Sequence, residues 1–511
     1  MTRPPSSPPA QDTPRAPGLG PRTAAALVFG SSAAVLVIEI AALRLLAPYL
    51  GLTLETSTMV IGIALTAIAL GSWLGGLIAD RVEPRLLIAP ALGVSGAVVA
   101  LTPAGLRASA EWVPVLLFLV AALTILVPGA LLAAVTPLVT KLRLTSLAET
   151  GTVVGRLSGV GTAGSIVGTV LTGFVFVSRW PVSGILIGLG TLLLVGSALI
   201  GWRTRGWTGT PALALVTVAG GLATTVAPGA CDTETRYHCV RVVADPDRDG
   251  GRTLVLDGVR HSYVDLADPT HLEFTYVRAI ASAVDAFFPE REPLVAHHLG
   301  GGGLTLPRYL AATRPGTRNV VSEIDGGVVA VDRTRFGRPD PRTEVRVEDG
   351  RLGLRRLDPG SRDLVVGDAF GGVSVPWHLT TAEAMADVRR VLSTNGLYVA
   401  NLIDHGDLAF ARAEVATLRA TFRHVSLIGK PADIGTGPSG TRVGGNFVVL
   451  ASHSDRPLAL RATQEALDAR RTGWSIATGA RLTSWIGDAQ PLTDDFAPVD
   501  QLLQPSPRRT R

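Results

Sequence analysis

The sequence predicts a multi-span α-helical membrane domain followed by an α/β domain, in which a small β-rich part precedes a Rossmann-like parallel sheet. Three observations lead to this fold class. Residues 23–229 are almost continuously apolar, residues 230–511 carry most of the charge, and the second half alternates strands with helices around a run of four glycines. The chain of 511 residues is 47% hydrophobic and 17% charged, which fits such a division better than either class alone.

The N-terminal segment 1–22 is Pro-rich and basic, so we expect it to be disordered. It has no clean cleavage site and a long apolar run follows it, which argues against a signal peptide. The formal net charge is a modest +5 and the arginines are scattered. Nucleic-acid binding is therefore not expected.

Seven stretches are long enough to cross the roughly 30 Å of bilayer hydrocarbon, which takes about 20 helical residues. They lie near 24–49, 56–79, 86–105, 113–138, 153–177, 182–202 and 210–229. The last one is short and rich in Thr and Gly. In the second, Gly71, Gly75 and Gly76 are small residues at a spacing that allows close helix packing.

The distribution of Lys and Arg places the N-terminus in the cytoplasm, by the positive-inside rule. Seven spans then put residue 230 onward outside the cell. Cys231 and Cys239, the only cysteines, follow the seventh span and are expected to form a disulfide there, with two free thiols as the alternative. Their spacing offers too few ligands for a zinc site, and no metal is expected.

Several ionisable residues receive a structural interpretation. Glu39 and Arg44 interrupt the first span and could form a substrate or proton site, but a structural ion pair or snorkelling is favoured. His297, His298 and His378 could form a cluster. However, adjacent histidines on a strand point to opposite faces of the sheet, so we expect them to be structural.

The soluble half divides into a β-rich part (230–287), an adenosyl-binding domain (288–455) and a C-terminal helix and tail (456–511). Strands alternate with helices after residue 288, which is typical of a parallel sheet whose ligand lies beyond the carboxyl ends of the strands. Those ends carry, in chain order, Gly300–Gly303, Glu323 with Asp325, Asp349 and Asp368. Glycines admit a close ligand, and carboxylates can accept from ribose hydroxyls or an adenine amino group. No Lys-Ser/Thr pair follows the glycines, so an adenosyl ligand without phosphates is expected.

These motifs resemble the spermidine synthase (polyamine aminopropyltransferase) family, and especially its membrane-fused bacterial branch. The resemblance covers roughly residues 250–455 and rests on several segments in the family's order. They are "LVLDGVRHSYVDLADPTHLEFTYVR", "HLGGGGLTLPRYL", "VVSEIDGGVV", "VEDG", "VVGDAFGGVSVPWHLTT" and "LSTNGLYVANLI", with "LTDDFAPVDQLL" near the end.

The resemblance implies transfer of an aminopropyl group from decarboxylated S-adenosylmethionine to putrescine or a related amine, giving spermidine and methylthioadenosine. It implies no permanently bound cofactor, small-molecule polyamine and adenosyl substrates, a lipid bilayer around the membrane half, and a homodimer. The implied roles are Asp368 as catalytic base, Glu323 for the ribose, Asp349 and Gly350 for the adenine, Gly300, Gly301, Gly302 and Gly303 for the methionine-derived part, and His261 and Tyr276 for substrate binding.

The sequence departs from the family's pattern where the polyamine is held. Gly303 and Gly371 stand where the family has acids, Val277 and Arg278 replace a His-Glu pair, and His261 replaces a Gln. Three hypotheses follow: an aminopropyltransferase whose missing charge is supplied by Glu273, Asp265 or Asp268; a methyltransferase that uses intact S-adenosylmethionine; or a non-catalytic membrane sensor or transporter. The family's donor is made in the cytoplasm, which conflicts with the side that the charge rule and the cysteines favour for the soluble half.

Overall fold

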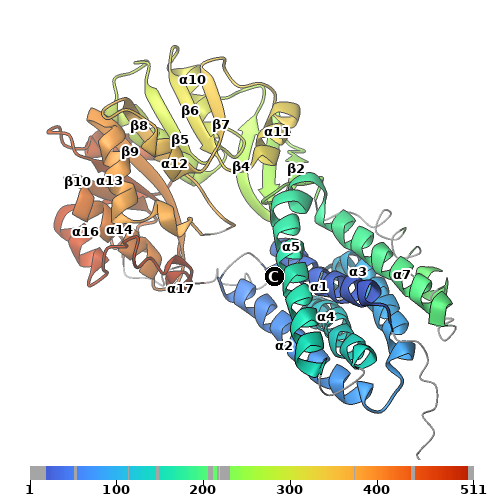
Figure 1. Ribbon diagram of the computed structural model, residues 1–511. Coiled ribbons are helices and arrows are strands. Elements are labelled where there is room, and N and C mark those ends of the chain that lie inside the picture. Colours follow the sequence, from blue (N-terminus) through green and yellow to red (C-terminus); the bar gives the residue numbers. More distant parts are fainter. Residues whose placement is uncertain are drawn as a thin grey trace, which may run out of the picture. The chain divides into compact units, whose positions relative to one another are not determined.

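A computed structural model describes residues 19–504 except 51–53, 113, 145–148, 205–210, 216–217, 219–221, 223–230, 373 and 439–442. The chain forms two compact units (Figure 1). One contains residues 1–46 and 55–229, and the other contains residues 47–54 and 230–511.

The first unit is a bundle of long apolar helices. They are α1 (Pro21–Leu50), α2 (Leu54–Ala79), α3 (Pro84–Trp112), α4 (Leu117–Arg143), α5 (Thr150–Leu171) and α7 (Val182–Thr204). A π-helical turn (Thr172–Phe176) continues α5 into the short α6 (Val177–Arg179). Within the described residues, six helices are long and apolar enough to cross a membrane, and they match the first six expected spans. The seventh, 210–229, lies largely outside the described residues.

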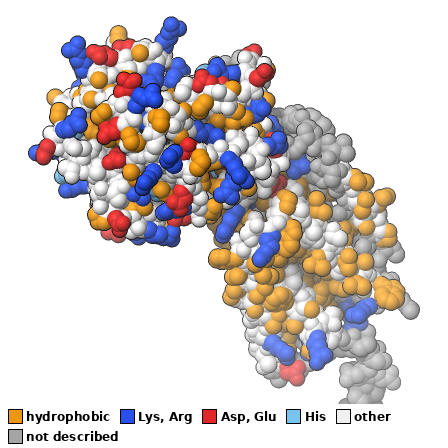
Figure 2. Space-filling view, turned by 90° about the horizontal axis from the view of Figure 1, so that it is seen from above, with side chains coloured by type: hydrophobic (Ala, Val, Ile, Leu, Met, Phe, Trp, Pro, Cys, Tyr) orange, Lys and Arg blue, Asp and Glu red, His pale blue; other side chains and the backbone are white. Residues whose placement is uncertain are grey.

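The outer surface of this unit is apolar. Large side chains stand exposed along the helices, with Trp73 62%, Phe174 71% and Leu192 67% exposed. Figure 2 shows hydrophobic side chains spread over this unit, whereas Lys, Arg, Asp and Glu are interspersed over the other. A bundle with an apolar exterior is compatible with a multi-pass membrane protein.

Small residues allow the helices to approach one another closely, as the sequence predicts. A Cβ on Gly75 of α2 would lie 2.7 Å from the Ala134 Cβ of α4, and a Cβ on Gly71 would overlap the backbone of Ala130. Gly76, the third glycine of the motif, has no neighbour within 4 Å of a built Cβ. Contacts at this distance replace the hydrophobic driving force that lipid does not supply.

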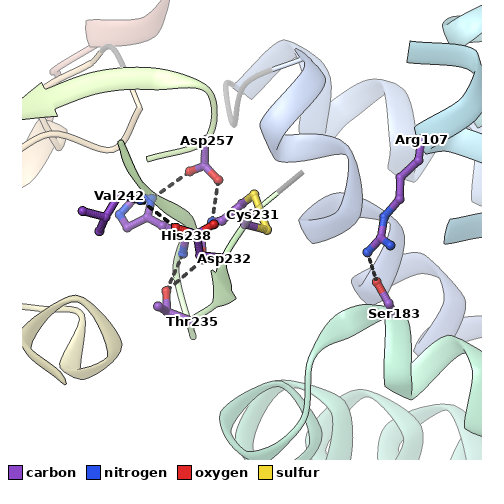
Figure 3. Close-up of a disulfide and its surroundings, with 9 residues drawn as sticks. Arg107, Ser183, Cys231, Asp232, Thr235, His238, Val242 and Asp257 are labelled. Carbon is purple, nitrogen blue, oxygen red and sulfur yellow. Dashed lines mark hydrogen bonds and ion pairs between the residues drawn. A yellow bond between two sulfur atoms is a disulfide. The ribbon is translucent and has the colours of Figure 1, made fainter. Parts of the chain in front are cut away.

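The second unit begins with a small antiparallel sheet of four strands in sequential order. They are β1 (Thr233–Glu234), β2 (Cys239–Ala244), β3 (Gly251–Leu256) and β4 (Val259–Asp265). Their apolar face, with Val240 and Leu254, packs on Val328 and Phe336 at helix α11 (Gly326–Arg335). A disulfide joins Cys231 to Cys239, and thus fixes the chain just before β1 to the start of β2, as expected (Figure 3).

The large sheet has eight strands in the order β12-β10-β11-β9-β8-β5-β6-β7. Five are parallel: β5 (Val295–Leu299), β6 (Arg318–Glu323), β7 (Thr343–Val347), β8 (Arg362–Gly367) and β9 (Leu392–Asp404). The other three pair antiparallel: β10 (His424–Gly429), β11 (Gly445–Ser452) and β12 (Ser475–Ala477). The Rossmann-like parallel sheet is confirmed, and it carries an antiparallel edge that alternation of strands and helices does not predict.

Helices cover both faces of this sheet. On one face α9 (Thr275–Phe287), α10 (Thr305–Thr313) and α15 (Leu460–Ala469) pack on strand residues such as Val366 and Val399. On the other, α12 (Gly350–Arg355), α13 (Ala382–Val391), α14 (Ala409–Thr421) and α16 (Gly479–Ile486) pack on residues such as Val365 and Ala400. Both side-chain sets of the central strands are therefore buried, which explains their continuous apolar runs.

The C-terminal segment contains more structure than one helix and a tail. Besides α15 it supplies β12, which pairs with β10 at the edge of the sheet, then α16 and a last short helix α17 (Val499–Leu502). Strand β12 has only three residues. A strand this short shows no readable period of two in the sequence.

Candidate active site

A pocket of about 810 Å³ lies in the second unit and is lined from both of its sheets. The large sheet contributes the carboxyl ends of its parallel strands, where a ligand is expected in such folds. The small sheet contributes residues of β4, Leu256 at the end of β3, and His238 just before β2. Of the residues that the sequence singles out, the lining includes Gly300, Gly301, Gly302, Glu323, Asp349, Gly350, Asp368, His261 and Tyr276.

The glycine turn after β5 is shaped for close approach. Gly300 has φ +93°, and a Cβ there would overlap the backbone oxygen of Asp368. Gly302 has φ +47°. Only glycine adopts such conformations at no steric cost, so the turn brings β5 and the end of β8 together beside the pocket.

Gly303 lies outside the pocket lining, in contrast to the prediction for the four glycines together. Its N–H donates to Ser262 Oγ at 2.9 Å. A Cβ at this position would lie 2.8 Å from Ser262 Oγ and 2.9 Å from Val264 Cγ2. Strand β4 therefore occupies the room that an aspartate would need, which gives a physical reason for the glycine.

Glu323, at the end of β6, is held by backbone donors. Gly301 N–H donates to its Oε2 at 2.8 Å, and Asp325 N–H donates to its Oε1 at 2.9 Å. Each oxygen has a further lone pair available, which suits acceptance from two neighbouring hydroxyls. Asp325 is buried and caps α11 by accepting from Gly327 N–H at 2.8 Å, so this second acid is structural.

Asp349 begins α12 and carries a partner that the sequence does not reveal. Its Oδ1 accepts from Leu352 N–H at 3.0 Å, and its Oδ2 accepts from His378 Nε2 at 2.8 Å. Burial raises its pKa, but these hydrogen bonds outweigh burial and leave the pKa below the usual range. His378 lines the pocket with Asp349 and Gly350, so it belongs to the candidate site, whereas His297 does not line the pocket.

Asp368 follows β8 and lines the pocket. Its Oδ1 accepts from Asn401 Nδ2 at 2.9 Å, and its Oδ2 accepts from the Tyr276 hydroxyl at 3.3 Å. Asn401 Oδ1 in turn accepts from Asn446 Nδ2 at 3.0 Å. Burial raises the pKa of Asp368 to about 6, although the two hydrogen bonds oppose the shift. Sequence reasoning missed both asparagines, which lie within long apolar strands.

Tyr276 and His261 form the wall next to Asp368. The Tyr276 hydroxyl also lies 3.4 Å from the backbone oxygen of His261. Burial and the neighbouring Asp368 raise the pKa of Tyr276 well above its usual value, so this hydroxyl stays a donor. Burial and His238 lower the pKa of His261 to about 4. Its Nε2 is buried without a partner among the described residues, as a group reserved for a ligand would be.

His238 is a further pocket residue that sequence reasoning missed. Its Nδ1 lies 2.7 Å from Asp257 Oδ2, and Asp257 Oδ1 accepts from Cys239 N–H at 2.9 Å (Figure 3). The imidazole is 6.3 Å from that of His261, measured between ring centroids. The disulfide of Cys239 therefore lies one residue from a side chain that lines the pocket.

The three acids expected to supply replacement charge differ in position. Glu273 lines the pocket and pairs with His271 at 3.5 Å. Asp265 and Asp268 do not line it: Asp265 pairs with Arg248 and accepts from the backbone of Ala267, and Asp268 accepts from Thr270. These two stabilise the turn after β4, so that part of the hypothesis is wrong.

His297 and His298 are buried in β5 and bonded within the fold. His298 Nε2 lies 3.0 Å from Asn319 Oδ1, and His297 Nε2 lies 3.2 Å from Ser322 Oγ. These contacts fit a structural role for both histidines, although His298 also lines the pocket. Across the described residues, no group of three or more His, Cys, Asp or Glu side chains is arranged to hold a metal ion.

Comparisons with known proteins point to one family. No family model matches the chain. The polyamine aminopropyltransferase of Vibrio vulnificus is 28% identical over 264 residues, which are 48% of this chain and 81% of that protein. That of Halorhodospira halophila is 32% identical over 174 residues, 33% of this chain and 59% of that protein. The crystal structure of a probable spermidine synthase from Corynebacterium glutamicum shares 31% identity and covers 51% of this chain and 95% of its own, with a TM-score of 0.47. Over about half of its length the chain is therefore similar to the polyamine aminopropyltransferases (spermidine synthases), which supports a transferase of that type.

Proposed function

We propose that this protein transfers the aminopropyl group of decarboxylated S-adenosylmethionine to the primary amine of putrescine or a related alkylamine, which leaves methylthioadenosine. The observation that carries the proposal is the position of Asp368. It is a pocket carboxylate with a raised pKa, oriented by Asn401 and Tyr276. A group with these features is suited to accept a proton at neutral pH.

The reaction is a displacement at the carbon next to the sulfonium. The amine nitrogen forms a bond to this carbon while the carbon–sulfur bond breaks and its electron pair goes to sulfur. The amine enters as an ammonium, so one proton must leave before its lone pair can attack. Asp368 accepts this proton. Because the nucleophile and the leaving sulfur lie in line, the acceptor lies on the far side of the reacting carbon from the adenosine.

Burial helps the proton transfer from both sides. An alkylammonium in water has a pKa of about 10.4 and a carboxyl about 3.9, so transfer between them is unfavourable. The pocket raises the pKa of Asp368 to about 6. The same low-polarity surroundings lower the pKa of an entering ammonium, because burial disfavours any charged form. The difference in pKa between the ammonium and Asp368 therefore becomes smaller, and the proton transfer becomes less unfavourable.

The adenosine of the donor lies at the β6 and β7 side of the pocket in this proposal. Glu323 accepts from the ribose hydroxyls, and Asp349 with Gly350 faces the adenine. Gly300–Gly302 allow the methionine-derived chain to pass over the backbone. Asp368, Tyr276 and His261 surround the attacking amine, and the unpartnered His261 Nε2 receives one of its hydrogens.

The test uses full-length protein purified in detergent, with decarboxylated S-adenosylmethionine and putrescine, and follows methylthioadenosine by mass spectrometry. We expect its release together with an aminopropylated amine. A parallel reaction with intact S-adenosylmethionine tests the methyltransferase alternative through release of S-adenosylhomocysteine. Tight methylthioadenosine binding without any turnover would instead support a sensor.

We further propose that the helical unit anchors the transferase in a bilayer, with the N-terminus in the cytoplasm and the soluble unit outside. The excess of Lys and Arg on one side of the expected spans and the disulfide support this orientation. The family resemblance supports a homodimer, and the charge pattern gives no support for nucleic-acid binding.

A further inference from the structure

The pocket is charged differently at its two ends. Four carboxylates line it: Glu323 and Asp349 after β6 and β7, Asp368 after β8, and Glu273 before α9. Among the described lining residues, none of the carboxylates comes from β9, β10, β11 or the loops at their ends. That side carries Asn401, Ile403, His405, Lys430, Gly445 and Asn446 instead.

Lys430 gives this side a positive charge. It follows β10, and its Nζ donates to the backbone oxygen of Gly444 at 2.9 Å. A Cβ on Gly445 would lie 3.5 Å from this Nζ, so the glycine leaves room for the side chain. Lys430 lines the pocket and is exposed, and among the described residues it forms no ion pair with a carboxylate. Two of its three N–H donors have no described partner.

The other polar groups on this side extend from the reacting centre toward the strands that precede and adjoin Lys430. Asn401 and Asn446 form a hydrogen-bonded chain from Asp368 across β9 to β11. Strands β8 and β10 are three positions apart in the sheet, or about 14 Å at ~4.8 Å per strand, and the Asp368 and Lys430 side chains shorten this gap. Burial and the Lys430 charge lower the pKa of His405, although Asp433 opposes the shift, and either form of the imidazole has an N–H that can donate to an anion.

We infer that the acceptor of this transferase carries an anionic group at the end opposite its reacting amine, so that the substrate class is an ω-amino acid rather than a diamine. This inference rests on the proposed function. The displacement places the acceptor on the opposite side of Asp368 from the adenosine. In the large sheet this is the side of β9, β11 and β10, where Lys430 lies. A carboxylate there accepts from Lys430 Nζ and the His405 imidazole, whereas the second ammonium of a diamine is repelled.

The covalent step remains balanced. The amino group of the ω-amino acid loses one proton to Asp368 and bonds to the propyl carbon, and the electron pair of the carbon–sulfur bond goes to sulfur. The products are an N-(3-aminopropyl) amino acid and methylthioadenosine. The carboxylate takes no part in bond making, so its recognition affects acceptor selectivity.

The experiment compares 4-aminobutanoate and 5-aminopentanoate with putrescine and cadaverine as acceptors, with the full-length protein and decarboxylated S-adenosylmethionine. We expect a higher kcat/KM for the amino acids, by about threefold to tenfold, because Lys430 is exposed and its pair with a carboxylate is screened. Lys430→Glu should reverse the preference, and Lys430→Arg should keep it. Arg461→Glu, a charge reversal at an exposed position of helix α15, should change neither.

Two results would overturn the inference. The first is a preference for diamines that Lys430→Glu leaves unchanged. The second is a preference for diamines that Glu273→Gln abolishes, because the far ammonium would then bind at Glu273. Calorimetric binding of 4-aminobutanoate to the methylthioadenosine complex separates this inference from the proposed function. Binding that Lys430→Glu removes, with no methylthioadenosine released from any amine, would support the anion site and reject the transfer reaction. Equal binding to both proteins would reject the site.

Discussion

The side-chain amide of Asn401 donates to the carboxylate of Asp368 at 2.9 Å, from the strand next to the one that Asp368 follows. The remaining lone pairs of this carboxylate face a pocket whose burial raises its pKa. The amide fixes the orientation of the carboxylate without neutralising it. In the proposed reaction Asp368 is thus a positioned base, and each prediction about catalysis starts from this pair.

Asp368→Asn removes the base while it preserves the shape of the side chain. We expect kcat for methylthioadenosine release to fall by about 10²–10⁴, the usual contribution of a general base. The dissociation constant of methylthioadenosine should change little, because its proposed adenosine contacts are Glu323 and Asp349. Asp488→Asn, at an exposed position, is the matched control and should retain full activity. An unchanged kcat in Asp368→Asn would reject Asp368 as the catalytic base.

The pH profile of kcat/KM should have an acid limb near pH 6. Burial raises the pKa of Asp368, so the carboxylate that accepts the proton is present above about pH 6 and is lost below it. Activity should fall about tenfold per pH unit on this limb. Steady-state rates between pH 4.5 and 8.5 in the same detergent test it, and a limb near pH 4 would mean that Asp368 is solvated or is not the base.

The same shift predicts a stability effect of the opposite sign. A carboxyl whose pKa is higher in the folded protein favours folding when protonated, and this contribution is lost as pH rises through the folded value near 6. Asp368→Asn should therefore raise the apparent Tm at pH 8 more than at pH 4. Thermal scans at both pH values test this, and equal shifts would point to packing rather than to the charge.

Tyr276→Phe should move the acid limb upward in pH. The tyrosine hydroxyl donates to Asp368 Oδ2 and thereby stabilises the charged form. Its loss should raise the pKa of Asp368 further, although the bond is long at 3.3 Å, so a shift of only a few tenths of a unit is expected. Tyr398→Phe is the control because Tyr398 is a buried tyrosine outside the pocket lining. A limb that does not move in Tyr276→Phe would leave this tyrosine a packing role only.

The sequence predicted the order of the large sheet's central elements and most of the pocket acids because both depend on local pattern. Apolar strands followed by helices define the parallel strands, and the residue after each strand end is fixed in place by the topology. Glu323, Asp349 and Asp368 therefore could be located from the chain alone. Their partners could not, because Asn401, Asn446 and His378 meet them only through sheet pairing and loop closure.

The residues that replace the family's acids illustrate the same limit. In the sequence Gly303 indicates the loss of a charged residue. The structure gives a steric reason for the glycine, because Ser262 and Val264 of the small sheet fill the space beside it. Asp265 and Asp268 look like candidate charges by sequence proximity, yet their oxygens are bonded within the turn after β4. Contacts between the two sheets decide these roles, and such contacts have no local signature.

His378 gives the next prediction. It was expected to be structural, but it donates to Asp349 beside the proposed adenine site. His378→Ala should raise the KM for the adenosyl donor about tenfold, as expected for loss of a charge-assisted hydrogen bond that positions a binding group. The KM for the amine and the pH of the acid limb should stay constant. Donor and amine titrations separate these effects, and a change in amine KM alone would contradict the assignment.

The last prediction concerns the disulfide and the side of the membrane. Bridging Cys231 and Cys239 closes a short loop, and a bridge of this size stabilises by about 2–3 kcal/mol in the chain-entropy model. Protein isolated from membranes under non-reducing, alkylating conditions should carry no alkyl label. A C-terminal alkaline phosphatase fusion should be active and a fluorescent-protein fusion dark, because disulfides persist outside the cytoplasm. Two labelled cysteines with a fluorescent C-terminus would instead place the soluble unit with the cytoplasmic donor. The chain would then cross the bilayer an even number of times, which the six described helices provide by themselves. Residues 210–229 would not form a seventh crossing.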